Sequence, residues 1–462
     1  MYEVNQHYYI PIKDCDPTRA PPSGSYSLSY VKRAVKKSSD TVLYSLGFYK
    51  NPLLASSLCS VSSVTSEEMS LLSSYQEVTQ ATDHVGRKLA KRNSSHADMR
   101  LSMVSNFSAA YNTVNISLGL TLMKALHPPT HPSDASVCSS ALIAGMIVGQ
   151  LGGGLLGDWL GRHMAMSVVM SLQVASAFWS AWVGLLGFGE SVGIYHLLAG
   201  CRFVLGIGCG GVYPLAATLT AESSAQRDDR GKLVALTFSM QGVGYLTVSV
   251  TAYALVLVLG EDSELAWRLL LGFGCLPGLG LIVVRTSYHR ATRNYDVKDV
   301  EIATVGKSKD NVKTTTRLDT KSLFQQIRHE PKLLSKILGT AGCWLLFDVL
   351  FYGNTLFQPV VFAAAFGNSE TVLATVRDST IISLMALPGY FVSVALVGKL
   401  TPKRIQLQGF FIMGLLYAVI GIKFSSLATN RLALILLYGL TFFSSNFGPN
   451  TTVSSVVTAL RA

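Results

Sequence analysis

Residues 154–162 read Gly154-Leu-Leu-Gly157-Asp158-Trp-Leu-Gly161-Arg162, in which glycines, a carboxylate and a guanidinium follow the spacing G-x-x-x-D-x-x-G-R. The stretch joins two apolar segments that we predict to be helices, 135–157 and 163–188. Glycines let two helices approach closely. Asp158 is placed either to pair with Arg162 or to cap the amino terminus of a neighbouring helix. The motif therefore predicts a tight charged turn between two packed helices.

The composition indicates a membrane protein. The chain has 462 residues, 49% of them hydrophobic and only 14% charged, against about 25% charged in soluble domains. Apolar stretches of about 20 residues, long enough to span a bilayer, recur from residue 101 onward. We predict an all-α polytopic membrane protein with about ten transmembrane helices, arranged as six, a long loop and four: 101–124, 135–157, 163–188, 193–222, 232–259, 266–286, 333–366, 376–400, 405–424 and 430–460.

The basic residues indicate how the helices are oriented. Lysines and arginines gather in alternate connections, whereas the opposite connections hold acidic residues such as Glu190, Glu261 and Glu370. The positive-inside rule places the amino terminus and the central loop in the cytoplasm. The net charge of +11 is thus explained by topology. We expect contact with the lipid bilayer and no nucleic-acid partner.

The charge pattern also divides the chain. We expect a cytoplasmic, largely disordered tail over 1–100, a six-helix transmembrane half over 101–287, a basic cytoplasmic linker over 288–332 and a second transmembrane half over 333–462. The seven cysteines are scattered, and several lie inside apolar runs, so they are expected to be packing residues. No catalytic triad, metal spacing or nucleotide motif is visible in the polar segments. We expect neither an enzyme nor a cofactor or metal.

Two helical segments carry polar groups that an apolar helix does not need. The run 202–218 contains Gly206, Gly210 and Pro214, and its glycines are better explained by helix packing than by a phosphate-binding loop, because the Lys-Ser/Thr of such a loop is missing. Trp344, Asp348 and Tyr352 recur every four residues and share one helix face. That face must look inward, because a carboxylate facing lipid is costly. It is either a structural polar stripe or a ligand site.

These stretches resemble a known family. The 154–162 pattern is similar to the signature of the major facilitator superfamily, and 202–222 looks like the signature of the phosphate:proton symporters of plants and fungi. Strings such as Cys343-Trp344-Leu-Leu-Phe-Asp348 and Asn446-Phe447-Gly448-Pro449-Asn450 resemble the same family. The resemblance implies a major facilitator fold and a phosphate site formed by Tyr213, Gln241, Trp344, Asp348, Tyr352, Asn450 and, more weakly, Asn446.

The resemblance also implies roles for individual residues. Asp348 would carry the coupling proton, and the gating motif would comprise Gly154, Asp158, Gly161, Arg162 and Arg202. For Asn446 and Asn450 an interhelical hydrogen bond is nearly as good an explanation as a ligand contact. Inorganic phosphate and protons are the expected partners, and a multi-pass protein of the plasma membrane is the expected location.

The chain departs from the family at the acids of its proton route. Ala109 and Asn112 replace the acidic pair of helix 1, and Val212 replaces the acid of helix 4. The repeat of the gating motif is lost at 398–403, and helices 11 and 12 are expected to be missing, as in a truncated, divergent member. The coupling ion is left open between a proton, sodium and none. The alternatives are a non-transporting phosphate sensor or regulatory isoform, and a facilitator of a sugar or carboxylate.

Overall fold

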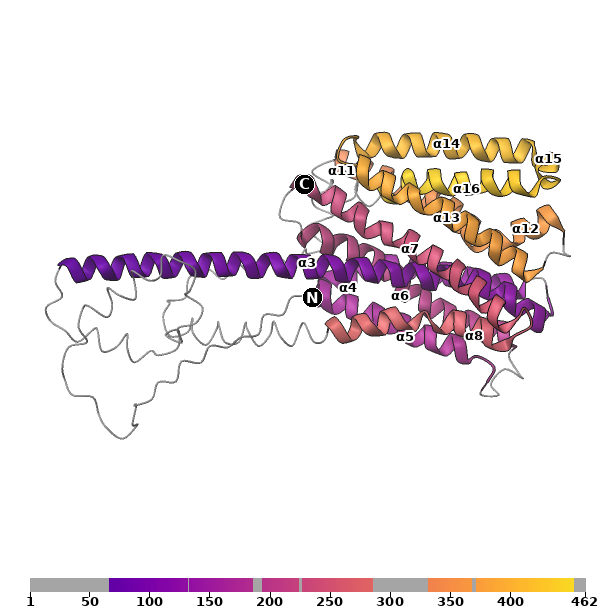
Figure 1. The fold of residues 1–462 in the computed structure, drawn as a ribbon, viewed down its shortest axis with the longest axis horizontal. Helices are drawn as coiled ribbons and strands as arrows, with labels where there is room; N and C mark the ends of the chain where they lie inside the picture. Colours follow the sequence, from indigo (N-terminus) through magenta and orange to yellow (C-terminus); the bar gives the residue numbers. More distant parts are fainter. Residues whose placement is uncertain are drawn as a thin grey trace. The chain divides into compact units, whose positions relative to one another are not determined.

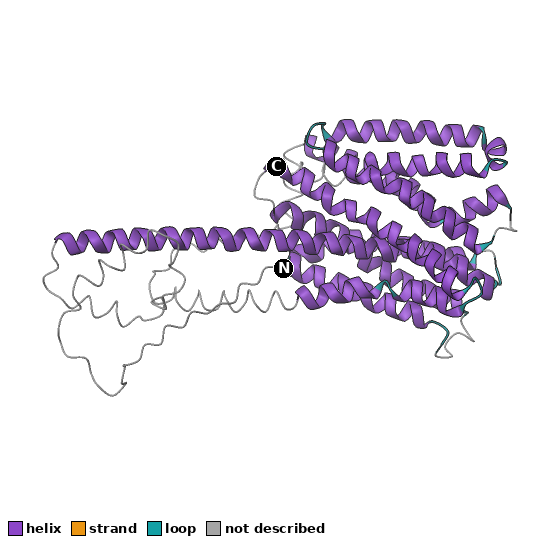
Figure 2. Cartoon of the chain, in the orientation of Figure 1, coloured by secondary structure: helices purple, strands orange, loops and turns teal. Residues whose placement is uncertain are grey.

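The computed structural model describes the backbone of residues 66–131, 133–185, 193–223, 227–285, 331–367 and 371–452. Within these ranges the secondary structure is helical and includes no strand (Figure 2). Residues 86–462 form one unit and residues 1–85 another. The predicted transmembrane helices all belong to the unit that begins at Gly86.

The first part of the fold follows the predicted helices, with shifted ends. Here the helices are α3 (Ser66–Leu126), α4 (Asp134–Leu160), α5 (Arg162–Trp182), α6 (Ile194–Ser223), α7 (Arg227–Leu259) and α8 (Glu264–Gly272). After a break at Phe273 and Gly274 the chain is helical again over 275–285. The sequence predicted a disordered tail over 1–100, but residues 66–100 belong to α3. Residues 1–65 lie outside the described part.

The second part begins with a broken helix. Its elements are α11 (Pro331–Leu356), α12 (Gln358–Phe366), α13 (Val372–Leu396), α14 (Pro402–Ile422), α15 (Phe424–Ala428) and α16 (Arg431–Phe447), with a further helical stretch at 449–452. The predicted helix 333–366 is therefore two helices that meet at Phe357. The predicted linker 288–332 falls almost entirely outside the described residues, as does the end of the predicted helix 430–460.

Nine helices of the described part are long and apolar enough to cross a membrane. The predicted first crossing, 101–124, falls within α3 but is not among these nine, because this segment is rich in polar residues. Many of its serines and asparagines are fully buried, among them Ser105, Asn106, Asn112 and Asn115. Other helices therefore surround this segment, which is why it can be polar where its neighbours are apolar.

Glycines allow α4 and α6 to pack backbone against backbone. A Cβ atom added at Gly145 would overlap the carbonyl oxygen of Phe203, and one added at Gly206 or Gly210 would overlap carbonyl oxygens of α4. Gly206 and Gly210 thus serve helix packing, as the small-xxx-small spacing predicted.

We expect Gly149→Ala to destabilise the protein by about 1–3 kcal/mol. Its Cβ would meet the backbone of Ile207 and Gly211, which cannot move aside as a flexible side chain could. The matched control is Gly152→Ala on the same helix, where nothing lies within 4 Å. Thermal denaturation in detergent should show a lowered melting temperature for Gly149→Ala alone. Equal melting temperatures for the two variants would contradict the close packing of α4 and α6.

The two parts of the fold meet along α7 and α13. Figure 1 shows α13 with α16 and α14 on one side and α7 on the other. Near the middle of this seam, Gly242 packs against the ring of Tyr390. Farther along, the hydroxyls of Ser249 and Ser383 are 2.9 Å apart. At its end, the carboxylate of Glu261 accepts hydrogen bonds from the backbone N–H groups of Val372 (3.1 Å) and Leu373 (3.4 Å).

The helices run between two ends of the bundle, named here by their residues. The motif end holds Asp158, Arg162 and Glu222. The Glu261 end holds Glu261 and the amino terminus of α13, which starts at Val372. The carboxylate of Glu261 lies at the positive end of the α13 dipole, so this contact joins the two parts of the fold by charge as well as by hydrogen bonds.

Candidate anion site

Four tyrosines on four helices meet where the two parts of the fold face each other. Tyr213 comes from α6, Tyr245 from α7, Tyr352 from α11 and Tyr390 from α13, and all four are buried. Tyr213 lies close enough to each of the other three tyrosines to interact with it electrostatically. This tyrosine cluster thus combines side chains from both parts of the chain.

Aromatic packing fixes the rings of the cluster. Tyr213 stacks on Phe238, with ring centroids 6.2 Å apart. The ring of Phe351 lies 6.0 Å from Tyr245 and 5.4 Å, edge to face, from Tyr352. Such pairs are favourable and directional. The hydroxyl positions are therefore set by the helices before any ligand binds.

Several polar atoms of this region are buried without a hydrogen-bond partner among the described residues. They are the hydroxyls of Tyr213 and Tyr245 and the side-chain oxygen of Gln241, which lies one turn before Tyr245 on α7. The Tyr213 hydroxyl comes near those of Tyr245 and Tyr352 without reaching hydrogen-bond geometry. An unsatisfied buried polar group costs about 1–3 kcal/mol. A ligand that both accepts and donates hydrogen bonds would remove this cost.

Asp348 adds a carboxylate to the cluster. It is half-buried on α11, one turn from Trp344 on one side and from Tyr352 on the other. Its carboxyl group lies beside the side chains of Trp344 and of Gln150 on α4. It is also an electrostatic neighbour of Tyr213 and Tyr245. The face of α11 that carries Asp348 and Tyr352 points into the bundle, as predicted. Leu345, Leu346 and Val349, on other faces of this helix, are exposed instead.

The two predicted asparagines lie at one side of the cluster and bond to protein groups. Asn450 donates to the hydroxyl of Tyr390 (2.7 Å) and to the side-chain oxygen of Asn446 (2.9 Å), and Asn446 donates to the carbonyl oxygen of Ala386 (3.1 Å). These bonds use both amide protons of Asn450 and one of the two amide protons of Asn446. In this structure both asparagines make the interhelical hydrogen bonds that the sequence left as an alternative, and Asn450 orients Tyr390.

Comparison with known proteins decides the family. Residues 101–462 match the Major Facilitator Superfamily. The chain belongs to this superfamily. Inorganic phosphate transporter 1-1 of Arabidopsis thaliana is 31% identical over 311 residues, which cover 58% of this chain and 59% of that protein. Low affinity inorganic phosphate transporter 4 of Medicago truncatula is 31% identical over 310 residues, which cover 58% of each.

The chain spans less than two thirds of the length of these curated relatives. Among solved structures, the xylose transporter XylE from E. coli in a partially occluded inward open conformation is similar, with a TM-score of 0.59 and 18% identity. The match covers 79% of this chain and 84% of XylE. At this identity the likeness concerns the fold alone. The protein is therefore a multi-pass integral membrane protein of the major facilitator superfamily.

The superfamily motif forms the contacts of the motif end. Arg162 donates to Asp158 at 2.5 Å and to Glu222, at the end of α6, at 3.3 Å. Gly161 has a positive φ of 84°, which explains the glycine at this turn. A Cβ atom added at Gly154 would meet no atom within 4 Å. The motif thus ties the turn between α4 and α5 to α6.

Arg202 does not lie with this motif. It is fully buried on α6, about 30 Å along the helix axis from Glu222 at about 1.5 Å per residue. It donates to the side-chain oxygen of Asn115 (2.9 Å) and to the backbone oxygen of Asn112 (3.4 Å). Its hydrogen-bond partners are on α3, far from the 154–162 motif, and its gating role stays a prediction.

Sequence reasoning missed three residues of the site. Tyr245 follows Gln241 by four residues, so the helical spacing that singled out Asp348 and Tyr352 could have found it. Tyr390 was not assigned to the site by the sequence analysis. Gln150 is a polar residue in an apolar helix, and only its position beside Asp348 reveals its relevance.

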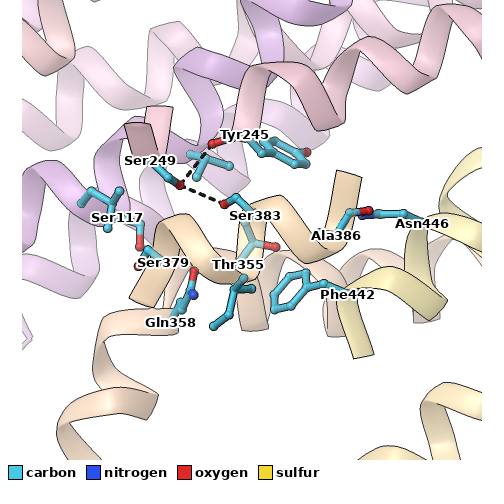
Figure 3. A pocket seen from close by; sticks show the side chains of 13 residues that line it. Ser117, Tyr245, Ser249, Thr355, Gln358, Ser379, Ser383, Ala386, Phe442 and Asn446 are labelled. Carbon is cyan, nitrogen blue, oxygen red and sulfur yellow. Dashed lines mark hydrogen bonds between the residues drawn. The ribbon is translucent and has the colours of Figure 1, made fainter. Parts of the chain in front are cut away.

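A small cavity adjoins the tyrosine cluster. It has a volume of about 30 Å³ and is lined by α3, α7, α11, α12, α13 and α16. Figure 3 shows Ser117, Ser249, Thr355, Gln358, Ser379 and Ser383 around it, with Tyr245 and Asn446 at its border. Tyr245 therefore belongs both to the tyrosine cluster and to the wall of this cavity.

Proposed function

We propose that the protein transports inorganic phosphate across a membrane by alternating access, with the anion bound in the tyrosine cluster. The observation that carries this proposal is the combination of two buried hydroxyls, on Tyr213 and Tyr245, with the carboxylate of Asp348. Neither hydroxyl has a partner in full hydrogen-bond geometry among the described residues. Named plant relatives are inorganic phosphate transporters. The motif end is proposed to face the cytoplasm, as the positive-inside rule suggests, and the plasma membrane is the proposed location.

Dihydrogen phosphate fits these groups because it has both acceptor oxygens and P–OH donors. The tyrosine hydroxyls would donate to its acceptor oxygens, and Trp344 would donate through its indole N–H. A P–OH group would donate to Asp348 or to the side-chain oxygen of Gln241. A carboxylate beside an anion is tolerated when one proton lies between them. The same proton would make Asp348 the coupling residue that the family resemblance implies.

The proposed mechanism uses the seam between α7 and α13. Anion binding at the meeting place of two repeats, with one repeat rocking against the other, is the general scheme of such transporters. The seam is joined at the Glu261 end by the Glu261 and Ser249–Ser383 contacts. For the site to open toward that end, these contacts must separate.

Uptake of radiolabelled phosphate into liposomes that contain the purified protein tests the function. We expect saturable uptake that protein-free liposomes lack. Saturable phosphate binding without uptake would favour the phosphate sensor, and uptake of a sugar or carboxylate in place of phosphate would favour the organic-solute facilitator. Either result would refute the proposal.

Replacing Tyr245 by phenylalanine should raise the KM for phosphate about tenfold, because a hydrogen bond to a charged group contributes about 1.5–3 kcal/mol. The ring and its packing on Phe351 stay in place. Tyr253→Phe, on the same helix but outside the cluster, is the matched control and should leave the KM unchanged. Equal KM values for the two variants would remove Tyr245 from the site.

A further inference from the structure

Arg202 places a positive charge in the interior of the helical bundle. It is fully buried, although it lies in a stretch of α6 that is otherwise apolar and rich in glycine. An arginine side chain keeps its charge at physiological pH. Burying a charge is costly unless an opposite charge and hydrogen bonds accompany it. The groups around Arg202 therefore indicate its role.

The hydrogen bonds of Arg202 go to neutral groups. Its Nη1 donates to the side-chain oxygen of Asn115 (2.9 Å) and to the backbone oxygen of Asn112 (3.4 Å). The other two guanidinium nitrogens, Nε and Nη2, are buried and have no hydrogen-bond partner among the described residues. The ionisable groups of the described part that interact with Arg202 electrostatically are three cysteine thiols, and no carboxylate is among them.

A second buried charge of the bundle shows the opposite arrangement. Asp378 on α13 is also buried, and its two carboxylate oxygens accept hydrogen bonds from Arg377 (3.0 Å) and Arg431 (2.7 Å). There the fold provides two guanidinium groups for one carboxylate. At Arg202 it provides one amide oxygen and one backbone oxygen. In the described part of the protein, the positive charge of Arg202 is thus left without a counter-charge.

This unpaired charge lies on the same helix as Tyr213 of the tyrosine cluster. Tyr213 follows Arg202 on α6 by about three helical turns, which is about 17 Å at about 1.5 Å per residue. Cys209, which lies between them in the sequence, interacts electrostatically with both side chains. All three side chains are buried. The charge and the proposed anion site are therefore connected through the protein interior.

The attraction over this distance is large enough to measure. At about 17 Å and an effective dielectric constant of about 20, one positive charge changes the binding constant of a monovalent anion about fivefold. Salt screens buried charges much less than exposed ones. The guanidinium of Arg202 therefore favours an anion in the tyrosine cluster at low and at high ionic strength.

We propose that Arg202 is the fixed counter-charge for the anion in the tyrosine cluster. Its guanidinium acts on the anion through space and not by contact. It lowers the electrostatic cost of bringing a phosphate ion into the bundle beside the carboxylate of Asp348. Asn115 holds the guanidinium without neutralising it. The inference rests on the proposed function, since it takes the tyrosine cluster as the phosphate site.

Asn115→Asp tests the proposal, because it places a carboxylate against Arg202. The side-chain oxygen at this position already lies 2.9 Å from Nη1, and aspartate has nearly the shape of asparagine. The change gives up a long bond from the amide nitrogen to the backbone oxygen of Leu270 (3.5 Å). We expect the dissociation constant for radiolabelled phosphate, measured on the purified full chain, to rise about fivefold. The melting temperature should rise by about 2–4 °C, because a charge-assisted hydrogen bond is stronger than a neutral one.

Two control variants separate charge from packing. Asn115→Ala removes the bond to Arg202 and adds no charge, so it should lower the melting temperature but raise the dissociation constant far less than Asn115→Asp does. Asn430→Asp adds the same negative charge at the exposed N-cap of α16, where both residues cap a helix well. It should leave the dissociation constant unchanged. The fivefold ratio should be the same at about 50 and about 500 mM choline chloride, because salt screens buried charges little.

A dissociation constant for Asn115→Asp equal to that of the unaltered protein would overturn the proposal. An equal rise in Asn115→Ala would overturn it as well, because Arg202 would then act through packing alone. Should Asn115→Asp fail to fold, Arg202→Gln replaces it, with the same expected rise and the same contradicting result. If the unaltered protein binds no phosphate, the proposed function fails and this inference with it. If it binds phosphate and Asn115→Asp binds equally well, this inference alone fails.

Discussion

Asp348→Asn is expected to lower phosphate uptake by a factor on the order of 100 while leaving the amount of protein in the membrane unchanged. Asparagine has nearly the shape of aspartate but has no negative charge and cannot take up a proton. It therefore cannot share a proton with dihydrogen phosphate, and its amide N–H groups would face Trp344 and Gln150, which lie beside it. Uptake into liposomes at equal protein content measures the effect.

The matched control is Asp262→Asn, which changes an exposed carboxylate at the Glu261 end. It should transport normally, so that charge loss in general is separated from loss at the site. Exchange of external for internal phosphate should be measured in the same liposomes. If Asp348→Asn accumulates phosphate as well as the unaltered protein does, the carboxylate has no part in binding or coupling.

A cysteine pair at positions 249 and 383 is expected to stop transport when oxidised. The hydroxyls of Ser249 and Ser383 are 2.9 Å apart across the seam of α7 and α13, so sulfur atoms in their place come within reach of a disulfide after small adjustment. A bond there prevents the separation of α7 from α13 that opening toward the Glu261 end requires. Nearly all uptake should be lost on oxidation and recovered on reduction.

Each single cysteine variant is the control, because it cannot form this bond. The reduced double variant shows separately whether the two substitutions disturb the nearby cavity. Among the native cysteines of the described part, Cys138 and Cys209 are buried but Cys343 is exposed. Oxidation of the unaltered protein therefore shows separately what reaction of the native thiols does to uptake. Continued uptake by fully cross-linked protein, with the bond verified by peptide mapping, would show that this seam does not open during transport.

Much of the fold could be predicted from local sequence. Apolar stretches of membrane length predicted α4 to α7, α13 and α14, and the start of α16, to within a few residues. The short helix α15 was not predicted. The break at Phe357 was missed because 333–366 is apolar on both sides of it. The helix before residue 100 was missed because a polar, charged composition is typical of disorder, whereas 66–100 continues the helix that carries Asn106 and Asn112.

The site was predicted less completely, for a physical reason. Helical periodicity shows that Asp348 and Tyr352 share a face, but it cannot show which helices that face meets. Gln150 and Tyr245 enter the site through contacts between helices. Arg202 shows the converse. The family resemblance grouped it with the gating motif, but in the folded chain it lies among the asparagines of α3. Outside the site, the sequence analysis also missed that Asp378 is a buried carboxylate. It forms ion pairs with Arg377 and Arg431.

Equilibrium binding of radiolabelled phosphate to the purified protein tests most directly whether the tyrosine cluster is a phosphate site. Binding should be saturable, displaced by arsenate, which has the same shape and charge, and unaffected by xylose or citrate. It should weaken markedly in Tyr213→Phe, which removes one hydroxyl that has no partner among the described residues, and remain normal in Tyr253→Phe. Displacement of phosphate by xylose or citrate, or binding in Tyr213→Phe equal to that of the unaltered protein, would contradict the assignment.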